Sequence, residues 1–178
     1  MLFILSLLFG VAVSAQAPAA SVPLPLTEWQ VQANDRFIAD TKQNMGYLVH
    51  EDGRYASFRI GSGQRRVVSY IGRTYNATTP VGYWKIKSLH RKGRSVTFGN
   101  GRFLRMYKDG DAYTAYGIHA TSNIDDILSW ETDDRYVSYG CILVSEEVLN
   151  ILEAAYILNG EMLEIVTVQG IDATSLSH

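Results

Sequence analysis

The stretch FGNGRFLRMYKDGDAYTAYGIH, which runs from Phe98 to His119, decides the fold of this chain. Two turn signals, Gly99-Asn100-Gly101 and Asp109-Gly110-Asp111, divide it into short runs of strand length. Glycine, asparagine and aspartate favour tight turns because they accept backbone conformations that other residues avoid. Together with the residues just before Phe98, the stretch therefore predicts three successive strands with turns between them. These strands are 95–98, 103–107 and 112–119.

The flanking sequence adds more strands and one helix. Asp52-Gly53 lies between two apolar-alternating runs and predicts a hairpin, because both turn positions need positive φ. A clear helical period begins after Ser145, the predicted N-cap, and ends at Asn159-Gly160, which gives a helix at about 146–158. The other predicted strands are 37–40, 46–51, 55–60, 66–71, 82–86 and 162–168. The predicted fold class is mainly β, as a two-sheet β-sandwich with one packed α-helix.

The composition fits one globular domain. The chain has 178 residues, of which 47% are hydrophobic and 19% charged, and a single core is expected at that size. A formal net charge of −2 and a pI of about 6.1 leave no surplus of positive charge for binding nucleic acid or an anionic bilayer. The predicted divisions are a signal peptide at 1–17, a linker and N-terminal segment at 18–35, one domain at 36–169 and a C-terminal tail at 170–178.

The first residues resemble a secretory signal. The run from Met1 to Val13 is almost wholly apolar, and Val13-Ser14-Ala15 is one candidate cleavage site among the small residues that follow. This run is shorter than the ~20 residues that cross a bilayer as a helix, so no membrane span is expected after processing. We therefore expect an exported protein.

The chain has one cysteine, Cys141. Cysteines of exported proteins usually form disulfides, so an unpaired one is either a small buried hydrophobic side chain or a reactive group. A free thiol of pKa ~8.5 is mostly protonated at neutral pH, and a nucleophilic role needs a neighbouring imidazole that takes the proton. Gly140, immediately before it, leaves space for a substrate backbone and lets N–H groups point inward as an oxyanion hole.

Three short stretches resemble the motifs of the L,D-transpeptidase family. They are Thr79-Pro80-Val81-Gly82, Tyr116-Gly117-Ile118-His119 and Val137-Ser138-Tyr139-Gly140-Cys141-Ile142, and they occur in the family's order. The resemblance covers roughly residues 37–168 and implies the L,D-transpeptidase catalytic fold. It also implies an enzyme, a cysteine acyltransferase, that resides in the periplasm or cell wall.

The resemblance assigns roles within the site. Cys141 would be the attacking thiolate, and His119 would be the general base that later protonates the leaving amine. Gly140 and the amide of Cys141 would hold the oxyanion, while Ser138 would order the site. The aromatic residues that we expect to bind substrate are Tyr139, Tyr116 and Trp130.

Two positions depart from the family pattern, and one segment has two interpretations. The family often has histidine where this chain has Tyr139, and arginine or asparagine where it has Leu143, which puts donor recognition in question. The connection from Ala120 to Val137 is predicted to be a long loop of the kind that forms lids. Its acidic side chains could attract an amine-bearing acceptor, or they could simply form a solvated surface.

The predicted function is that of a peptidoglycan L,D-transpeptidase. A stem peptide would acylate Cys141 and lose its terminal D-residue, and the amine of a second peptide or a free D-residue would resolve the thioester. Two alternatives remain open: an L,D-carboxypeptidase in which water resolves the thioester, and a peptidoglycan-binding module that has lost catalysis. The expected partners are peptidoglycan stem peptides and no nucleic acid, and we expect a monomer.

No metal or cofactor is predicted, and other cysteine enzymes fit less well. The remaining histidines, His50, His90 and His178, lack the spacing of metal ligands. Papain-like proteases place cysteine before histidine, the reverse of the order here. Sortases need an arginine downstream of the cysteine, and no arginine follows Cys141.

Overall fold

The computed structural model describes residues 21–171 and Leu176, so the predicted signal peptide lies outside the described residues. Its strands are β1 (Val22–Pro23), β2 (Arg36–Asp40), β3 (Met45–Val49), β4 (Arg54–Arg59), β5 (Ser62–Gly63), β6 (Val67–Tyr70), β7 (Arg73–Asn76), β8 (Gly82–Arg91), β9 (Arg102–Lys108), β10 (Ala112–His119), β11 (Tyr136–Ser138), β12 (Ile142–Leu143) and β13 (Leu163–Val168). Its helices are the 3-10 turns η1 (Leu26–Glu28) and η2 (Thr132–Arg135) and the α-helices α1 (Ile124–Ser129) and α2 (Glu146–Leu158). The predicted mainly β class is confirmed, and α2 spans the predicted helix.

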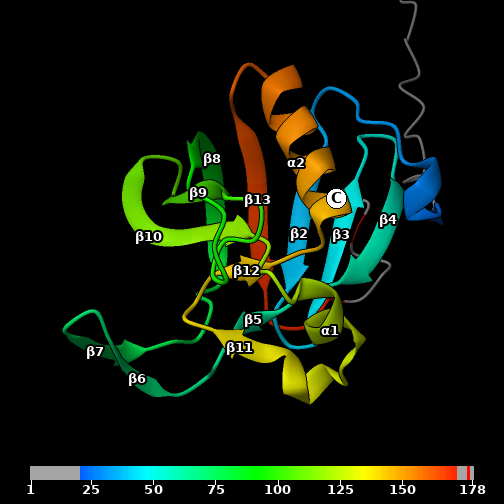
Figure 1. Cartoon of the computed structure of the whole chain (residues 1–178). Helices are drawn as coiled ribbons and strands as arrows, with labels where there is room; N and C mark the ends of the chain where they lie inside the picture. The colour runs from blue at the N-terminus through cyan, green and yellow to red at the C-terminus, as the bar shows by residue number, and fades with distance from the viewer. Residues whose placement is uncertain (1–20, 172–175, 177–178) are drawn as a thin grey trace, which may run out of the picture.

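Nine strands form one continuous sheet in the order β1-β4-β3-β2-β13-β8-β9-β10-β12 (Figure 1). The last strand, β13, joins its two halves because it pairs in parallel with β2 and antiparallel with β8. The two layers predicted for the sandwich are therefore parts of one continuous hydrogen-bonded sheet. Two small ladders, β11-β5 and β6-β7, lie beside it.

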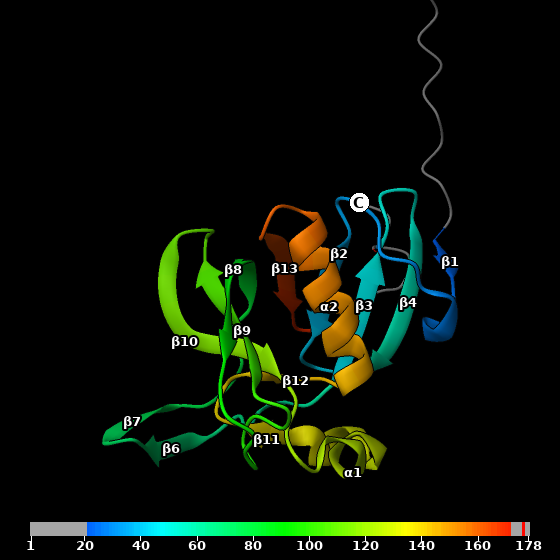
Figure 2. The ribbon, with the colours of Figure 1, turned by 45° about the horizontal axis from the view of Figure 1, so that its top comes forward.

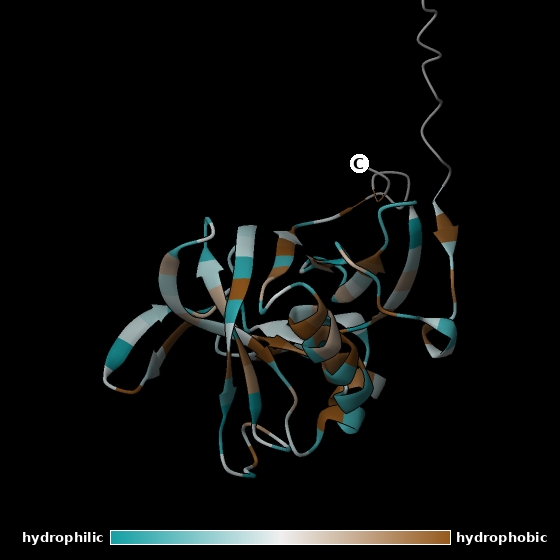
Figure 3. Ribbon diagram, turned by 90° about the horizontal axis from the view of Figure 1, so that it is seen from above, coloured by the Kyte–Doolittle hydropathy of each residue, from teal (hydrophilic) through white to brown (hydrophobic). Residues whose placement is uncertain are grey.

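The helix α2 packs its apolar face into the main core. Val148, Leu149 and Leu152 are buried together with large side chains of the central strands, such as Phe37 and Leu104. Ser145 caps the helix as predicted, since its hydroxyl accepts a hydrogen bond of 3.1 Å from the backbone N–H of Val148. The buried residues of α2 follow the helical repeat, as expected of a helix with one buried face, and Figure 3 shows that the helix carries both hydrophobic and hydrophilic residues.

Two strand predictions need correction. Residues 95–98 do not form a strand: Ser95 makes one isolated bridge to Gly99, and its hydroxyl accepts a hydrogen bond from the N–H of Phe98, so the segment closes into a turn. The predicted strand 66–71 is the first arm of a hairpin, because the chain reverses at Ile71 and Gly72 and returns as β7. This β6–β7 hairpin projects from the body of the molecule (Figures 1 and 2).

The connection from Ala120 to Val137 was predicted to be a loop, and this prediction is wrong. It contains α1, η2 and the start of β11, which pairs in parallel with β5. Arg135 anchors the segment: its Nε donates to the carbonyl of Ile60 at 3.1 Å, and its Nη1 donates to the carbonyl of Trp130 at 2.7 Å. A segment held by buried hydrogen bonds is part of the domain, not a free lid.

The described part of the predicted linker packs onto the sheet. Val22 and Pro23 pair in parallel with β4. Trp29 is buried and stacks on His50 with 3.7 Å between ring centroids. The Nδ1 of His50 lies 2.6 Å from the carboxylate of Asp35, so this histidine has a structural role away from the cysteine. Between residues 21 and 171, neither α-helix has the length and apolar character needed to cross a bilayer.

Candidate active site

Three adjacent strands, β9, β10 and β12, form the floor of the site. Arg105 on β9 pairs with Gly117 on β10, and one residue further Leu104 pairs with Ile118. On the other side, Ile118 pairs with Ile142 and His119 with Leu143 in a parallel register. Paired residues in a sheet point to the same face, and successive residues alternate.

The register defines two rows of side chains on one face of the sheet. One row contains Phe103, His119 and Leu143. The other contains Arg105, Gly117 and Cys141, which immediately precedes β12. All of them except Gly117 line one cavity, which agrees with this common orientation.

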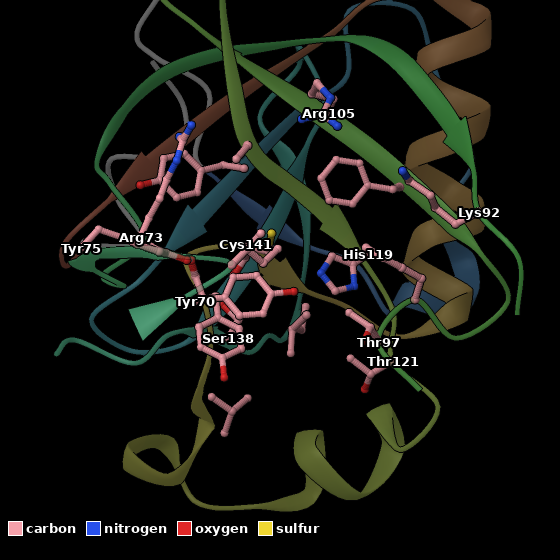
Figure 4. A pocket seen from close by; sticks show the side chains of 18 of the residues that line it. Tyr70, Arg73, Tyr75, Lys92, Thr97, Arg105, His119, Thr121, Ser138 and Cys141 are labelled. Atoms are coloured by element: carbon pink, nitrogen blue, oxygen red, sulfur yellow. The ribbon is translucent and has the colours of Figure 1, made fainter. Parts of the chain in front are cut away.

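His119 and Cys141 are therefore diagonal neighbours on the cavity side of the sheet. Diagonal positions on adjacent strands lie roughly 7–8 Å apart at the backbone, a gap that an imidazole and a thiol can close. Figure 4 shows both side chains pointing into the same cavity. The structure thus brings together the two residues predicted to carry the chemistry.

The imidazole of His119 is held in one orientation. Its Nδ1 lies 2.9 Å from the carbonyl oxygen of Ala120 and donates to it, which leaves Nε2 as the proton acceptor of the neutral ring. Two aromatic rings pack beside it, Phe98 with 5.1 Å and Phe103 with 5.7 Å between centroids. Burial lowers the pKa of His119, and hydrogen bonds with the backbone of Ala120 and Thr97 oppose this shift. The ring is consequently neutral at pH 7 and available as a base.

The side chain of Cys141 is a protonated thiol at neutral pH. Burial raises its pKa to about 11, although a backbone hydrogen bond from Gly117 and the positive charge of Arg105 act in the opposite direction. The residue keeps a partly exposed surface, and it lines the cavity. A protonated resting thiol next to a neutral imidazole is the arrangement expected of a cysteine that is activated only when a proton is transferred.

Ser138 and Gly140 shape the backbone before the cysteine. The hydroxyl of Ser138 donates to the carbonyl of Cys141 at 2.6 Å and accepts from the N–H of Gly140 at 3.1 Å. Gly140 has φ of +111°, and a Cβ there would lie 2.5 Å from the ring of Tyr116. Its N–H is already bonded to Ser138, so the Gly140 amide that was predicted to hold the oxyanion has a partner within the protein.

The cavity has a volume of about 1170 Å³, and the β6–β7 hairpin forms part of its wall. The sequence had not indicated this hairpin. Tyr70 on this hairpin stacks on Tyr139 with 4.3 Å between centroids. The hydroxyl of Tyr75 donates to the carbonyl of Tyr139 at 3.1 Å. The predicted substrate-binding residues Tyr139 and Tyr116 line the cavity, whereas Trp130 does not.

The acidic side chains of the 120–137 segment lie elsewhere. From this segment, Thr121, Ile127 and Val137 line the cavity, and none of Asp125, Asp126, Glu131, Asp133 and Asp134 does. The charges that face the cavity are positive instead. They are Arg73, Lys92 and Arg105.

Thr79 and His90 lie near the site but outside the pair of His119 and Cys141, and His178 lies outside the described residues. The hydroxyl of Thr79 accepts a hydrogen bond of 2.9 Å from the N–H of Gly63, so the Thr-Pro motif fixes β5 next to the site. His90 accepts a hydrogen bond of 3.1 Å from Nε of Arg105. Over residues 21–171 and Leu176, no cluster of three or more histidine, cysteine and acidic side chains could hold a metal ion.

Comparison with known proteins shows the family of this chain. The sequence matches the model of the family described as L,D-transpeptidase catalytic domain (YkuD) over residues 34–158, which is more than half of the 178 residues. No curated protein matches the sequence significantly.

Three solved structures share the fold. An L,D-transpeptidase from Xylanimonas cellulosilytica is 22% identical over 79% of this chain and 63% of its own, with a TM-score of 0.56. L,D-transpeptidase 3 from Mycobacterium tuberculosis, in complex with a faropenem-derived adduct, is 16% identical over 77% of this chain and 60% of its own, with a TM-score of 0.52. An Enterococcus faecium L,D-transpeptidase is 14% identical over 78% of this chain and 50% of its own, with a TM-score of 0.51. This chain spans less than two thirds of each, and the predicted fold type is confirmed.

Proposed function

The chain belongs to the L,D-transpeptidase catalytic-domain family, and we propose that it is an exported cysteine acyltransferase that acts on peptidoglycan stem peptides. The observation that supports this most directly is the placement of His119 and Cys141 at diagonal positions on one face of the sheet, lining one cavity. The family membership supports action on the cell wall.

The site can carry out acyl transfer in two steps, acylation of Cys141 and transfer to the acceptor. Nε2 of His119 takes the proton of the Cys141 thiol as sulfur attacks the carbonyl before the terminal D-residue of the donor. When the C–N bond breaks, the imidazolium returns the proton to the leaving amine, and a thioester remains on sulfur. The amine of an acceptor peptide then attacks the thioester while His119 takes its proton, and the thiol is regenerated. The amide of Cys141 would bind the oxyanion of both tetrahedral intermediates.

The first test is covalent trapping of Cys141. Because the solved M. tuberculosis enzyme carries a faropenem-derived adduct, faropenem is a suitable probe for this chain. We expect an adduct by intact-protein mass spectrometry, mapped to Cys141 by peptide sequencing and absent from Cys141→Ala. A synthetic stem tetrapeptide should give cross-linked dimers as well as release of its terminal D-residue. An unmodified Cys141 after incubation with both probes would contradict the proposal, and release without dimers would replace the transferase by a carboxypeptidase.

Ser138 is expected to influence the rate of acylation. In Ser138→Ala, the hydrogen bonds to Gly140 and Cys141 are lost, and the peptide plane that holds the Cys141 amide is free to rotate. Two lost hydrogen bonds of about 1 kcal/mol each predict acylation by faropenem slower by about tenfold or more. Ser138→Thr keeps the hydroxyl and is the matched control. Acylation of the alanine variant at the unaltered rate would show that this hydroxyl does not position the site.

A further inference from the structure

Arg105 is a buried cation on the floor of the cavity. It is only 9% exposed, and it lies in the same row as Gly117 and Cys141. Because Gly117 between them has no side chain, the guanidinium and the thiol face the same space. Figure 4 shows Arg105, Cys141 and His119 around the cavity.

The protein gives Arg105 only neutral partners. Its Nε donates to Nε2 of His90 at 3.1 Å, and its Nη1 donates to the carbonyl of Thr114 at 2.6 Å. The guanidinium also lies over the rings of Phe103 and Tyr113, at 5.0 Å and 4.6 Å from their centroids. Across residues 21–171 and Leu176, no carboxylate lies within ion-pair distance of it, and Nη2 makes no hydrogen bond. A buried charge without a counter-ion is unfavourable, which indicates that its partner comes from outside the chain.

The rest of the cavity has the same sign of charge. Arg73 on the β6–β7 hairpin and Lys92 after β8 are exposed at its rim, and neither forms an ion pair with the described residues. No aspartate or glutamate lines the cavity. The pocket therefore attracts an anion, and the buried guanidinium is its fixed end.

We propose that Arg105 binds a carboxylate of the acyl-donor peptide and so determines which donors reach Cys141. This inference rests on the proposed function. Two strand spacings place the Cα atoms of Arg105 and Cys141 roughly 10 Å apart. A carboxylate within about one residue of the scissile carbonyl fits between the two side chains. The planar guanidinium suits such a group because it can donate two parallel hydrogen bonds.

Two carboxylates of the donor meet this description, and binding to a non-reacting protein distinguishes them. The probes are three forms of one stem tetrapeptide that ends in a diamino dicarboxylic acid and a D-residue: the free acid, the C-terminal amide, and the side-chain amide of the diamino acid. Dissociation constants are measured by calorimetry with Cys141→Ala, so that binding is read without turnover. We expect one of the two amides to bind about ten- to a hundredfold more weakly than the free acid, as expected for a lost charged hydrogen-bonded pair.

The same measurement in Cys141→Ala with Arg105→Gln should lose this preference. Arg105→Lys keeps the positive charge but cannot donate two parallel hydrogen bonds, so an intermediate preference is expected. This second variant provides the test if the glutamine variant folds poorly. Arg66→Gln is the matched control, because it removes the same charge from an exposed residue that does not line the cavity, and it should keep the preference. Equal binding of all three peptides by the parent, or an unchanged preference in both Arg105 variants, would overturn the inference. An Arg105-dependent preference without any acylation of the unaltered protein would uphold the subsite and refute the proposed reaction.

Discussion

At pH 7, His119→Gln is expected to be acylated by faropenem about a thousandfold or more slowly than the unaltered protein. The pKa of Cys141 is raised to about 11 by burial, so without a base only about one molecule in ten thousand carries a thiolate at pH 7. The imidazole removes this limitation by taking the proton during the attack. The glutamine side chain is polar and of similar reach, but it cannot accept the proton.

The pH dependence of this variant separates a base from a merely structural residue. Burial lowers the pKa of His119 below the ordinary 6.5, so the acid limb of the unaltered protein should lie below that value, where the ring becomes protonated and cannot act. Above it, the rate should be nearly constant through neutral pH. In His119→Gln, the rate should rise about tenfold for each pH unit until the thiol itself ionises near pH 11.

Acylation rates from pH 5 to pH 10 by intact-protein mass spectrometry provide the measurement. Cys141→Ala gives the background, and thermal unfolding of His119→Gln checks that the fold persists. A glutamine variant that keeps the flat profile of the parent would show that another group deprotonates the thiol. If that variant were also slower at every pH, His119 would contribute to the rate by packing and not as the base.

The two residues proposed to react could be named from sequence because few residue types can do this chemistry. Cys141 is the only cysteine, and a glycine precedes it, so its neighbours already pointed to a nucleophile. The placement of His119 beside it depends on the parallel pairing of β10 with the two-residue strand β12. So short a strand has no periodicity to detect, and its register follows only from the folded chain.

The hairpin over the cavity was missed for a reason that lies in its turn. Ile71 has φ of +48° and is followed by Gly72 at +71°, which is the pattern of a tight two-residue turn. A β-branched residue rarely adopts positive φ, so the sequence read as a strand continuing through Ile71. The exposed, mostly polar residues of β7 gave no second signal.

Arg105 was missed because a single strand does not reveal its neighbours. In the sequence it interrupts the apolar run from Phe103 to Tyr107, and its alternation with Leu104 and Met106 places it on the opposite face from the core. That face is usually solvent, where an arginine needs no explanation. Its burial depends on His90 from β8 and on Tyr113 from β10, which only the folded sheet places beside it.

Gly117→Ala is expected to destabilise the fold by about 2 kcal/mol or more, and to slow acylation of Cys141 by about a hundredfold or more. A Cβ at this position would lie 2.3 Å from Cζ of Phe103 and 2.6 Å from the carbonyl oxygen of Leu104. The oxygen belongs to the paired strand and cannot move without breaking the pairing of β9 with β10. The Phe103 ring can move, and it must turn away to make room for the methyl group. That ring packs against His119, and its displacement disturbs the imidazole next to the thiol.

Urea unfolding and faropenem acylation measure the two effects of this methyl group separately. Gly93→Ala is the control, because a Cβ there has no atom within 4 Å, and it should change neither quantity. Phe103→Leu in the Gly117→Ala background should recover part of the stability, since a smaller side chain leaves room for the methyl group. The pair should therefore be less destabilised than the sum of the single changes, by about 0.5–3 kcal/mol. Strictly additive effects would mean that Phe103 does not limit the space above Gly117, and that the residue between Arg105 and Cys141 is not required to be glycine for this reason.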